Sequence, residues 1–168
     1  KRSINSINIY KGGKSSVTGK DNIIKLSSNE NSYGPSPKVL DHINKSETLL
    51  NSHRYPSIDG IELREKIAIT HNLDANRIIL GCGSDETLLF AALAFCQDGD
   101  EIVHAKHGFE MYSIITKIVG ATSKLIEENT NYTIDVDSIL QQITPSTKII
   151  YLANPNNPTG TYLSRTEI

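Results

Sequence analysis

The residues of this chain best suited to chemistry lie in one short stretch, residues 81–86, with the sequence Gly-Cys-Gly-Ser-Asp-Glu. The apolar run 78–80 precedes it and a longer apolar run follows, which predicts a buried strand, a glycine turn and the start of a helix. Ser84 suits the N-cap of that helix, and Asp85 and Glu86 suit its first turn. The unpaired amides of such a helix start can bind an anion such as a phosphate.

Two features of this stretch leave its role open. A bound phosphate would be repelled by acidic side chains, so we expect the carboxylates of Asp85 and Glu86 to point away while their backbone amides bind. A plain corner between a strand and a helix explains the same residues about as well, because short glycine motifs often occur by chance.

Two later loops, residues 106–112 and 154–160, also follow predicted strands. In an open parallel sheet, loops at the carboxyl ends of the strands converge on one crevice. Phe109 could stack on a flat ligand, and the side-chain amide of Asn157 could donate to a ring oxygen. With a phosphate site, these groups would suit a phosphorylated aromatic cofactor. Phe109 could instead belong to the core, and Asn157 could simply shape a turn.

The rest of the chain alternates between predicted strands and predicted helices. Runs rich in β-branched residues predict strands over residues 23–26, 78–80, 101–105, 122–126 and 148–153. Capping residues followed by helical apolar spacing predict helices that begin near residues 36, 60, 84, 111 and 135. This alternation predicts an α/β fold with a mostly parallel sheet, in which residues 77–105 form a βαβ unit with a right-handed crossover.

Composition narrows the classes of function. The 168 residues are 38% hydrophobic and 21% charged, with a net charge of −2, so we expect no general attraction to nucleic acid or to an anionic membrane. The apolar runs are too short to span a bilayer, and the beginning of the sequence lacks the apolar region of a signal peptide. Cys82 and Cys96 are expected to be free thiols in a reducing cytoplasm. The five histidines lack metal-ligand spacing, so no metal site is expected.

Several segments together resemble the fold-type-I, pyridoxal-phosphate-dependent aminotransferases, and among them the histidinol-phosphate aminotransferase branch. Residues 156–160, Asn-Asn-Pro-Thr-Gly after an apolar strand, resemble the N-P-x-G signature of the family. Further similar segments, in matching order and spacing, are residues 10–15, 26–31, 34–37, 54–56, 81–86 and 109–112. The resemblance implies a three-layer α/β/α fold. Residues 1–35 would form an N-terminal arm and substrate loop, and residues 36–168 the first part of the large cofactor-binding domain.

The resemblance implies pyridoxal 5'-phosphate as the cofactor and assigns roles around it. The backbone amides of Ser84 and Asp85 would hold the phosphate. Phe109 would stack on the pyridine ring, where relatives often carry tyrosine, and Asn157 would donate a hydrogen bond to the phenolic oxygen of the ring.

The resemblance also implies a homodimer, histidinol phosphate as substrate, 2-oxoglutarate as amino acceptor, and a place in histidine biosynthesis in the cytoplasm. Tyr55 would reach the cofactor phosphate of the neighbouring subunit. Tyr10, Asn29 and Glu30 would lie near the substrate.

Some features depart from the family. Ser32 stands where proline is common, and His107 with Gly108 replaces a usual proline-containing pair. The lysine that forms the Schiff base is expected beyond Ile168, so no catalytic residue is assigned within residues 1–168. The capping box at residues 164–167 lacks the body of a helix, which suggests a fragment covering about the first half of a family member.

Three alternatives stay open on the sequence alone. Two are enzymes on the same scaffold, an aromatic-amino-acid aminotransferase and a threonine-phosphate decarboxylase. The third is a catalytically inactive fragment, which would expose apolar surface where half a sheet is left uncovered.

Overall fold

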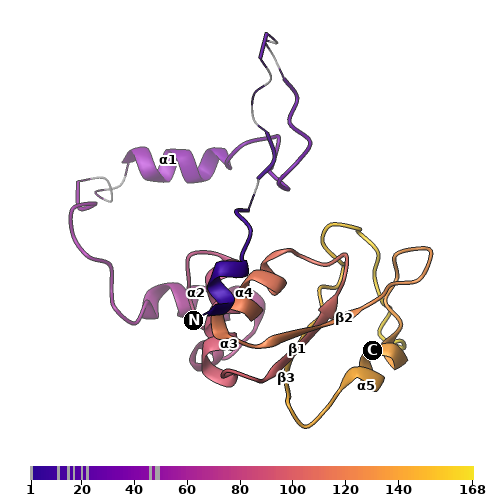
Figure 1. Ribbon diagram of the computed structural model, residues 1–168. Helices are drawn as coiled ribbons and strands as arrows, with labels where there is room; N and C mark the ends of the chain where they lie inside the picture. The colour runs from indigo at the N-terminus through magenta and orange to yellow at the C-terminus, as the bar shows by residue number, and fades with distance from the viewer. Residues whose placement is uncertain are drawn as a thin grey trace. The chain divides into compact units, whose positions relative to one another are not determined.

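The computed structural model describes residues 2–10, 12–14, 16, 18–19, 21, 23–45, 47 and 50–168 (Figure 1). Contacts divide the chain into two compact units, one of Lys1–Asn8 with Ile79–Ile168 and the other of Ile9–Ile78. The boundary expected near residue 35 stays a prediction.

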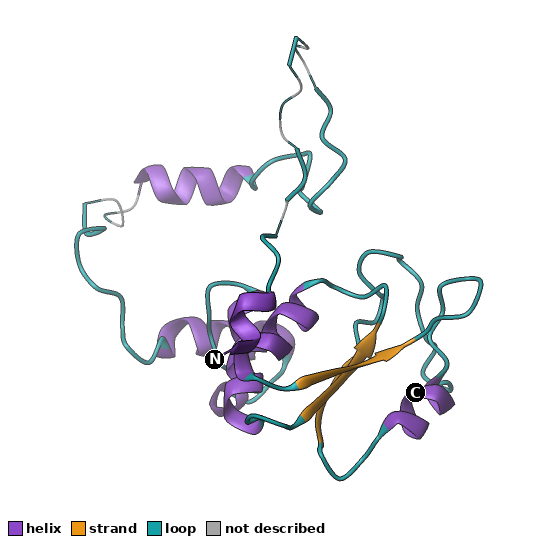
Figure 2. Ribbon diagram, in the orientation of Figure 1, coloured by secondary structure: helices purple, strands orange, loops and turns teal. Residues whose placement is uncertain are grey.

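The first unit is built on a parallel sheet of three strands, drawn in orange in Figure 2. Strand β1 (Glu101–Ala105) lies in the centre, with β2 (Thr122–Ile126) on one side and β3 (Thr147–Tyr151) on the other. Both pairings are parallel, so the carboxyl ends of all three strands meet at one edge of the sheet. The predicted parallel α/β sheet is confirmed.

Helices cover both faces of this sheet. Helices α3 (Ser84–Phe95) and α4 (Met111–Val119) lie on one face, and α5 (Val136–Gln142) lies on the other (Figure 1). Successive side chains of a strand point to opposite faces. In β1, Ile102 accordingly packs in a buried cluster with α3 and α4, whereas Val103 packs in a second cluster that includes Ile139 of α5. This arrangement is the α/β/α three-layer fold that the resemblance implied.

Local signals set the ends of these helices. Gly120 ends α4 with a φ of 86°, a left-handed conformation that glycine adopts without strain. Asp135 caps α5 as predicted, because its carboxylate accepts hydrogen bonds from the backbone N–H groups of Asp137 (3.3 Å) and Ser138 (3.2 Å). The 3₁₀ helix η1 (Arg2–Ser6) packs against α4, where Lys117 Nζ donates to the Ser6 carbonyl at 3.1 Å.

The second unit contains helices α1 (Pro37–Lys45) and α2 (Ile61–His71) and the 3₁₀ helix η2 (Ala75–Arg77). Both α-helices were predicted. The apolar stripe of α1 is only partly covered, since the residue Val39 is 50% exposed. The predicted strand at residues 23–26 is wrong: this segment forms no ladder with any described residue. No described helix has the length and apolar character needed to cross a membrane.

The predicted strand at residues 78–80 is also wrong. Ile78 has extended backbone angles, with φ −109° and ψ 125°, but the segment pairs with no strand among the described residues. Ile79 is 74% exposed, although its side chain suits a buried strand. An extended segment becomes a strand only when a neighbouring backbone supplies its hydrogen bonds. Residues 77–105 therefore form no βαβ unit, whereas β1, α4 and β2 do form one.

Candidate functional site

The glycine turn before α3 produces the expected free amides, but its capping differs from the prediction. The N-cap is Gly83, which has a φ of 81° and no side chain to cap the helix, and Ser84 is the first helical residue. The first bond of the helix runs from the N–H of Thr87 to the carbonyl of Gly83 at 3.4 Å. The amides of Ser84 and Asp85 come before that bond and so lack an acceptor within the helix.

The side chain of Glu86 does not point away from the turn, which corrects the expectation from sequence. Its Oε2 accepts a hydrogen bond from the backbone N–H of Cys82 at 2.6 Å. A Cβ atom on Gly81 would lie 3.0 Å from the same oxygen, so a larger residue at position 81 would crowd the carboxylate. An amide in a tight turn needs an acceptor, and a carboxylate is a strong one, which explains why Glu86 folds back. Asp85 is exposed.

The start of α3 lies toward the carboxyl edge of the sheet. The hydroxyl of Tyr151, the last residue of β3, donates to the carbonyl of Leu88 at 2.8 Å. Leu88 follows Ser84 by four residues, about 6 Å along the helix axis. The free amides of the first turn of α3 are therefore about one helical turn from a residue that contacts the end of β3.

Phe109 lies in the turn between β1 and α4. The turn begins with a hydrogen bond from the N–H of Gly108 to the carbonyl of Ala105 at 3.3 Å. The Phe109 ring is half-buried and meets the ring of Tyr112 edge-on, with centroids 5.8 Å apart and an angle of 88°. It packs against the buried cluster under α3 and α4. Phe109 thus contributes to the core, and part of its surface is left accessible at the carboxyl edge of the sheet.

Asn157 is half-buried in the loop after β3, and the neighbouring residue Asn156 holds this loop in place. The N–H of Gly160 donates to the carbonyl of Asn156 at 2.8 Å, and the N–H of Asn156 donates to the carbonyl of Thr161 at 2.7 Å. The bonds before Pro155 and Pro158 are both cis.

Asn156 is a functional candidate that sequence reasoning missed. Its residue surface is only 6% exposed, and its Nδ2 donates to the carbonyl of His107 at 3.3 Å. This bond brings the loop of Asn157 next to the turn of Phe109. The sequence places Asn156 between two prolines and at the start of the segment that resembles the family signature, but neither feature reveals a partner 49 residues away.

The other predicted residues belong to the second unit. Tyr55 is fully exposed, and Tyr10 is 54% exposed. Asn29 has a φ of 53°, and Glu30 forms an ion pair with Lys25. Their roles at a shared site stay predictions. Among the described residues, no group of three or more His, Cys, Asp or Glu side chains could hold a metal ion.

Residues 21–168 match the sequence profile of the family "Aminotransferase class I and II". The chain belongs to this family. It is 48% identical over 165 residues to a histidinol-phosphate aminotransferase from Ruegeria pomeroyi, covering 98% of this chain and 45% of the relative. A histidinol-phosphate aminotransferase from Paramagnetospirillum magneticum is 46% identical with the same coverage. The chain therefore spans less than half the length of these curated relatives.

Solved structures of aminotransferases share the fold. A putative histidinol-phosphate aminotransferase from Erwinia carotovora atroseptica superposes with a TM-score of 0.74 at 27% identity, over 83% of this chain and 40% of the other. The histidinol-phosphate aminotransferase from Sinorhizobium meliloti, solved in complex with pyridoxal-5'-phosphate, superposes with a TM-score of 0.72 at 22% identity. The match covers 78% of this chain and 35% of the other. The first agrees with the family assignment, and the second supports the fold alone.

Proposed function

We propose that this chain is part of a pyridoxal-phosphate-dependent aminotransferase that acts on histidinol phosphate, with 2-oxoglutarate as the amino acceptor, in histidine biosynthesis. The observation that carries the proposal is the 48% identity to a histidinol-phosphate aminotransferase along 98% of the chain. Identity at this level, over an alignment of 165 residues, is far more specific than any single motif. Because the chain spans 45% of that relative, the activity belongs to the whole enzyme rather than to these residues alone.

The groups at the carboxyl edge of the sheet fit the cofactor. The unpaired amides of Ser84 and Asp85 offer donors to a phosphate, and the positive end of the α3 dipole favours an anion there. Phe109 offers a partly accessible ring for stacking, and Asn157 offers a side-chain amide to a ring oxygen. Asn156 links the loops that carry these last two residues.

In this proposal the described residues bind and orient, and they transfer no proton. Bound pyridoxal phosphate would supply the electron sink for the amino-group transfer. The amides of Ser84 and Asp85 would fix one end of the cofactor, and Phe109 would fix the plane of its ring. Asn157 would donate to the ring oxygen and so help to set the electron-withdrawing strength of the ring. The lysine that bonds covalently to the cofactor is expected outside residues 1–168.

The proposal extends to the oligomeric state and the cellular compartment. We infer a homodimer in the cytoplasm, in which Tyr55 donates to the cofactor phosphate of the partner subunit and Tyr10, Asn29 and Glu30 lie near the substrate. Tyr55 is fully exposed, so its hydroxyl is accessible to another molecule, as this role requires.

Glutamate formation tests the proposed reaction. Protein purified at its full natural length and saturated with pyridoxal phosphate is mixed with 2-oxoglutarate and one amino donor. We expect glutamate with histidinol phosphate at a kcat/KM at least a hundredfold above that with phenylalanine. Preference for phenylalanine would support the aromatic aminotransferase, and carbon dioxide release from threonine phosphate would support the decarboxylase. Either result would contradict the proposal, as would no glutamate from any donor.

A further inference from the structure

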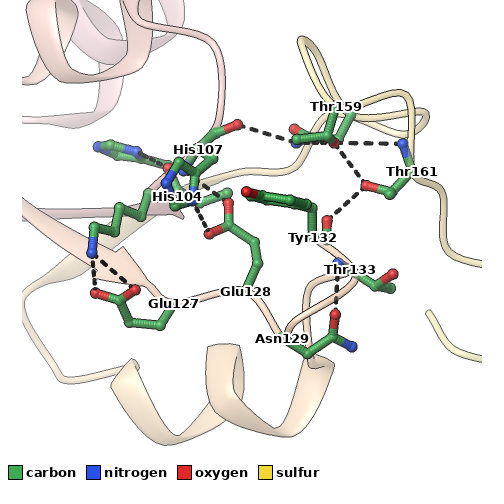
Figure 3. Close-up of polar contacts among 12 residues, drawn as sticks. His104, His107, Glu127, Glu128, Asn129, Tyr132, Thr133, Thr159 and Thr161 are labelled. Carbon is green, nitrogen blue, oxygen red and sulfur yellow. Dashed lines mark hydrogen bonds and ion pairs between the residues drawn. The ribbon is translucent and has the colours of Figure 1, made fainter.

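The turn that carries Phe109 is held by a buried carboxylate. Oε1 of Glu128 accepts a hydrogen bond from the backbone N–H of His107 at 2.8 Å, and its Oε2 lies 2.9 Å from His107 Nδ1 (Figure 3). The side chain of Glu128 is only 2% exposed, whereas that of His107 is 50% exposed. A carboxylate is rarely buried to this extent without partners, and both of these bonds come from one residue of the turn.

The same residue is held from its other side by Asn156. While the N–H of His107 donates to Glu128, its carbonyl accepts from Asn156 Nδ2 at 3.3 Å. Asn156 Nδ2 also donates to Thr159 Oγ1 at 2.8 Å. His107 lies two residues before Phe109, and Asn156 lies next to Asn157. The two proposed cofactor contacts are thus joined through His107 and Asn156.

A third segment closes the network. The ring of Tyr132 meets the ring of His107 edge-on, with centroids 5.5 Å apart and an angle of 87°. The hydroxyl of Thr161 donates to the carbonyl of Tyr132 at 2.7 Å, and the Thr161 and Thr159 hydroxyls lie 2.7 Å apart. Contacts therefore run in a closed circuit through the turn after β1, the segment after β2 and the loop after β3 (Figure 3). Each of these three segments therefore contacts the other two.

Two adjacent carboxylates lie near the turn, and one, Glu128, is buried whereas the other, Glu127, is exposed. Burial acts to raise the pKa of Glu128, but hydrogen bonds from the His107 side chain and main chain outweigh burial and leave the pKa below its ordinary value. Glu128 is therefore ionised at neutral pH. The adjacent residue Glu127 is exposed and pairs with Lys106 Nζ at 2.8 and 3.0 Å. Glu127 and Glu128 thus form a matched pair of carboxylates: Glu127 contacts the turn only through the exposed side chain of Lys106, whereas Glu128 binds the main chain and ring of His107.

From this circuit we propose that Glu128 and His107 are positioning residues for cofactor binding. The Glu128 carboxylate fixes the main chain and ring of His107, and thereby fixes the turn that presents Phe109. Through Asn156, the same contact sets the spacing between the stacking ring of Phe109 and the amide of Asn157. The inference rests on the proposed function, since it concerns how this chain holds pyridoxal phosphate.

The test compares variants of the protein purified at its full natural length. Glu128→Ala removes both bonds to His107, and Glu128→Gln keeps an acceptor oxygen while removing the charge. Glu127→Ala is the matched control for losing a neighbouring carboxylate. Thr144→Ala is a control for destabilisation alone, because it breaks the 2.6 Å bond to Glu101 at the start of β1, away from the turn. The readouts are the dissociation constant for pyridoxal phosphate and the circular dichroism of the bound cofactor at saturation.

For Glu128→Ala we expect the dissociation constant to rise about 10- to 100-fold, since hydrogen bonds to a charged group are lost, and the dichroism per bound cofactor to fall. Glu128→Gln should restore most of the cofactor affinity and most of the dichroism. The two controls, Glu127→Ala and Thr144→Ala, should show the dichroism of the parent protein. Parent values in Glu128→Ala, or equal losses in Thr144→Ala, would overturn the inference. If Glu128→Ala does not fold, His107→Ala replaces it as the test variant. We then expect a smaller rise in the dissociation constant, and a dissociation constant and dichroism equal to those of the parent protein would overturn the inference. A parent protein that binds no pyridoxal phosphate would instead overturn the proposed function, and the positioning role with it.

Discussion

At the scale of single residues, several polar side chains act on the backbone of the loops rather than facing a ligand. Glu86 accepts from the N–H of Cys82, and Asn156 donates to the carbonyl of His107. Such bonds hold irregular backbone in one conformation, because a loop has no ladder of its own to satisfy its N–H and C=O groups. We therefore expect the proposed cofactor contacts to depend on these neighbours as well as on their own side chains.

Glu86 gives the first prediction. Glu86→Ala leaves the N–H of Cys82 without its acceptor and should lower the free energy of unfolding by about 1 kcal/mol, since the site is partly exposed. It should also weaken pyridoxal phosphate binding by releasing the turn before Ser84. Urea unfolding and a cofactor titration measure the two effects. Asp85→Asn removes a charge from the same helical turn without touching that bond and is the control; equal losses in both variants would contradict the role given to Glu86.

His104 gives a prediction for pH. It is 3% exposed in β1, with Nδ1 2.9 Å from the carbonyl of Ala105, and burial, partly offset by that hydrogen bond, lowers its pKa. The unfolded chain, with a histidine pKa of about 6.5, then takes up the proton more readily. The contribution of buried, neutral His104 to the free energy of unfolding should be complete above about pH 6.5 and should decrease as the pH drops below that value.

Urea unfolding at pH 7.5 and pH 5.5 checks this expectation. His104→Gln should lose less stability between the two pH values than the parent protein does, because the buried titrating group is gone. His53→Gln, at an exposed position, should keep the pH dependence of the parent, since His104 is still present. An identical pH dependence in His104→Gln and the parent would show that His104 does not carry the effect.

At the scale of elements, the contacts between α3 and the sheet decide where the free amides lie. The Tyr151 ring stacks on Tyr112 of α4, with centroids 4.8 Å apart, and its hydroxyl reaches α3 at Leu88. Burial chiefly, with the nearby Cys96 and Tyr112, raises the pKa of Tyr151 to about 12. The hydroxyl therefore stays a hydrogen-bond donor throughout the physiological range.

Tyr151→Phe removes the bond between β3 and α3 while keeping the ring. We expect the free energy of unfolding to fall by about 1 kcal/mol, because the carbonyl of Leu88 loses its donor. The loss should shrink above about pH 10, where the unfolded tyrosine begins to ionise and the folded one does not. Tyr162→Phe, whose side chain is 69% exposed, is the control and should stay near the parent value. A Tyr151→Phe protein as stable as the parent would contradict this bond.

The elements also show how far sequence reasoning reaches. The strand predicted at residues 122–126 is β2 with the same bounds, and the helix predicted to end at Gly120 does so, because apolar spacing and glycine are local signals. The prediction of a strand at residues 78–80 was wrong because a strand needs a partner strand, which its own sequence cannot specify. The turn of Glu86 toward Cys82 and the bond from Asn156 to His107 were missed for a related reason. Each depends on which backbone group lacks a partner, and that is known only once the chain has folded.

At the scale of the whole molecule, the proposed cofactor site takes residues from more than one subunit. The described residues offer phosphate donors, a stacking ring and an amide, but no lysine is assigned to the cofactor among residues 1–168. Tyr55, in the second unit and fully exposed, is proposed to complete the phosphate site of a partner subunit. On this account, assembly and cofactor binding are linked.

Tyr55→Phe should therefore weaken pyridoxal phosphate binding about 10-fold or more without changing the mass of the dimer, because one hydrogen bond to a charged phosphate is lost. A cofactor titration and light scattering measure the two quantities. Tyr33→Phe removes a hydroxyl at a similarly exposed position, 98% exposed, and is the control. An unchanged dissociation constant for Tyr55→Phe, or a monomeric parent protein, would contradict the shared site.

The most direct test of the central claim is a crystal structure of the protein at its full natural length with bound pyridoxal phosphate. The decisive measurement is the distance from the cofactor phosphate oxygens to the backbone nitrogens of Ser84 and Asp85. We predict distances of about 2.7–3.2 Å, with the ring against Phe109 and its oxygen within the same range of Asn157 Nδ2. A phosphate bound elsewhere, with Phe109 and Asn157 away from the ring, would contradict the account.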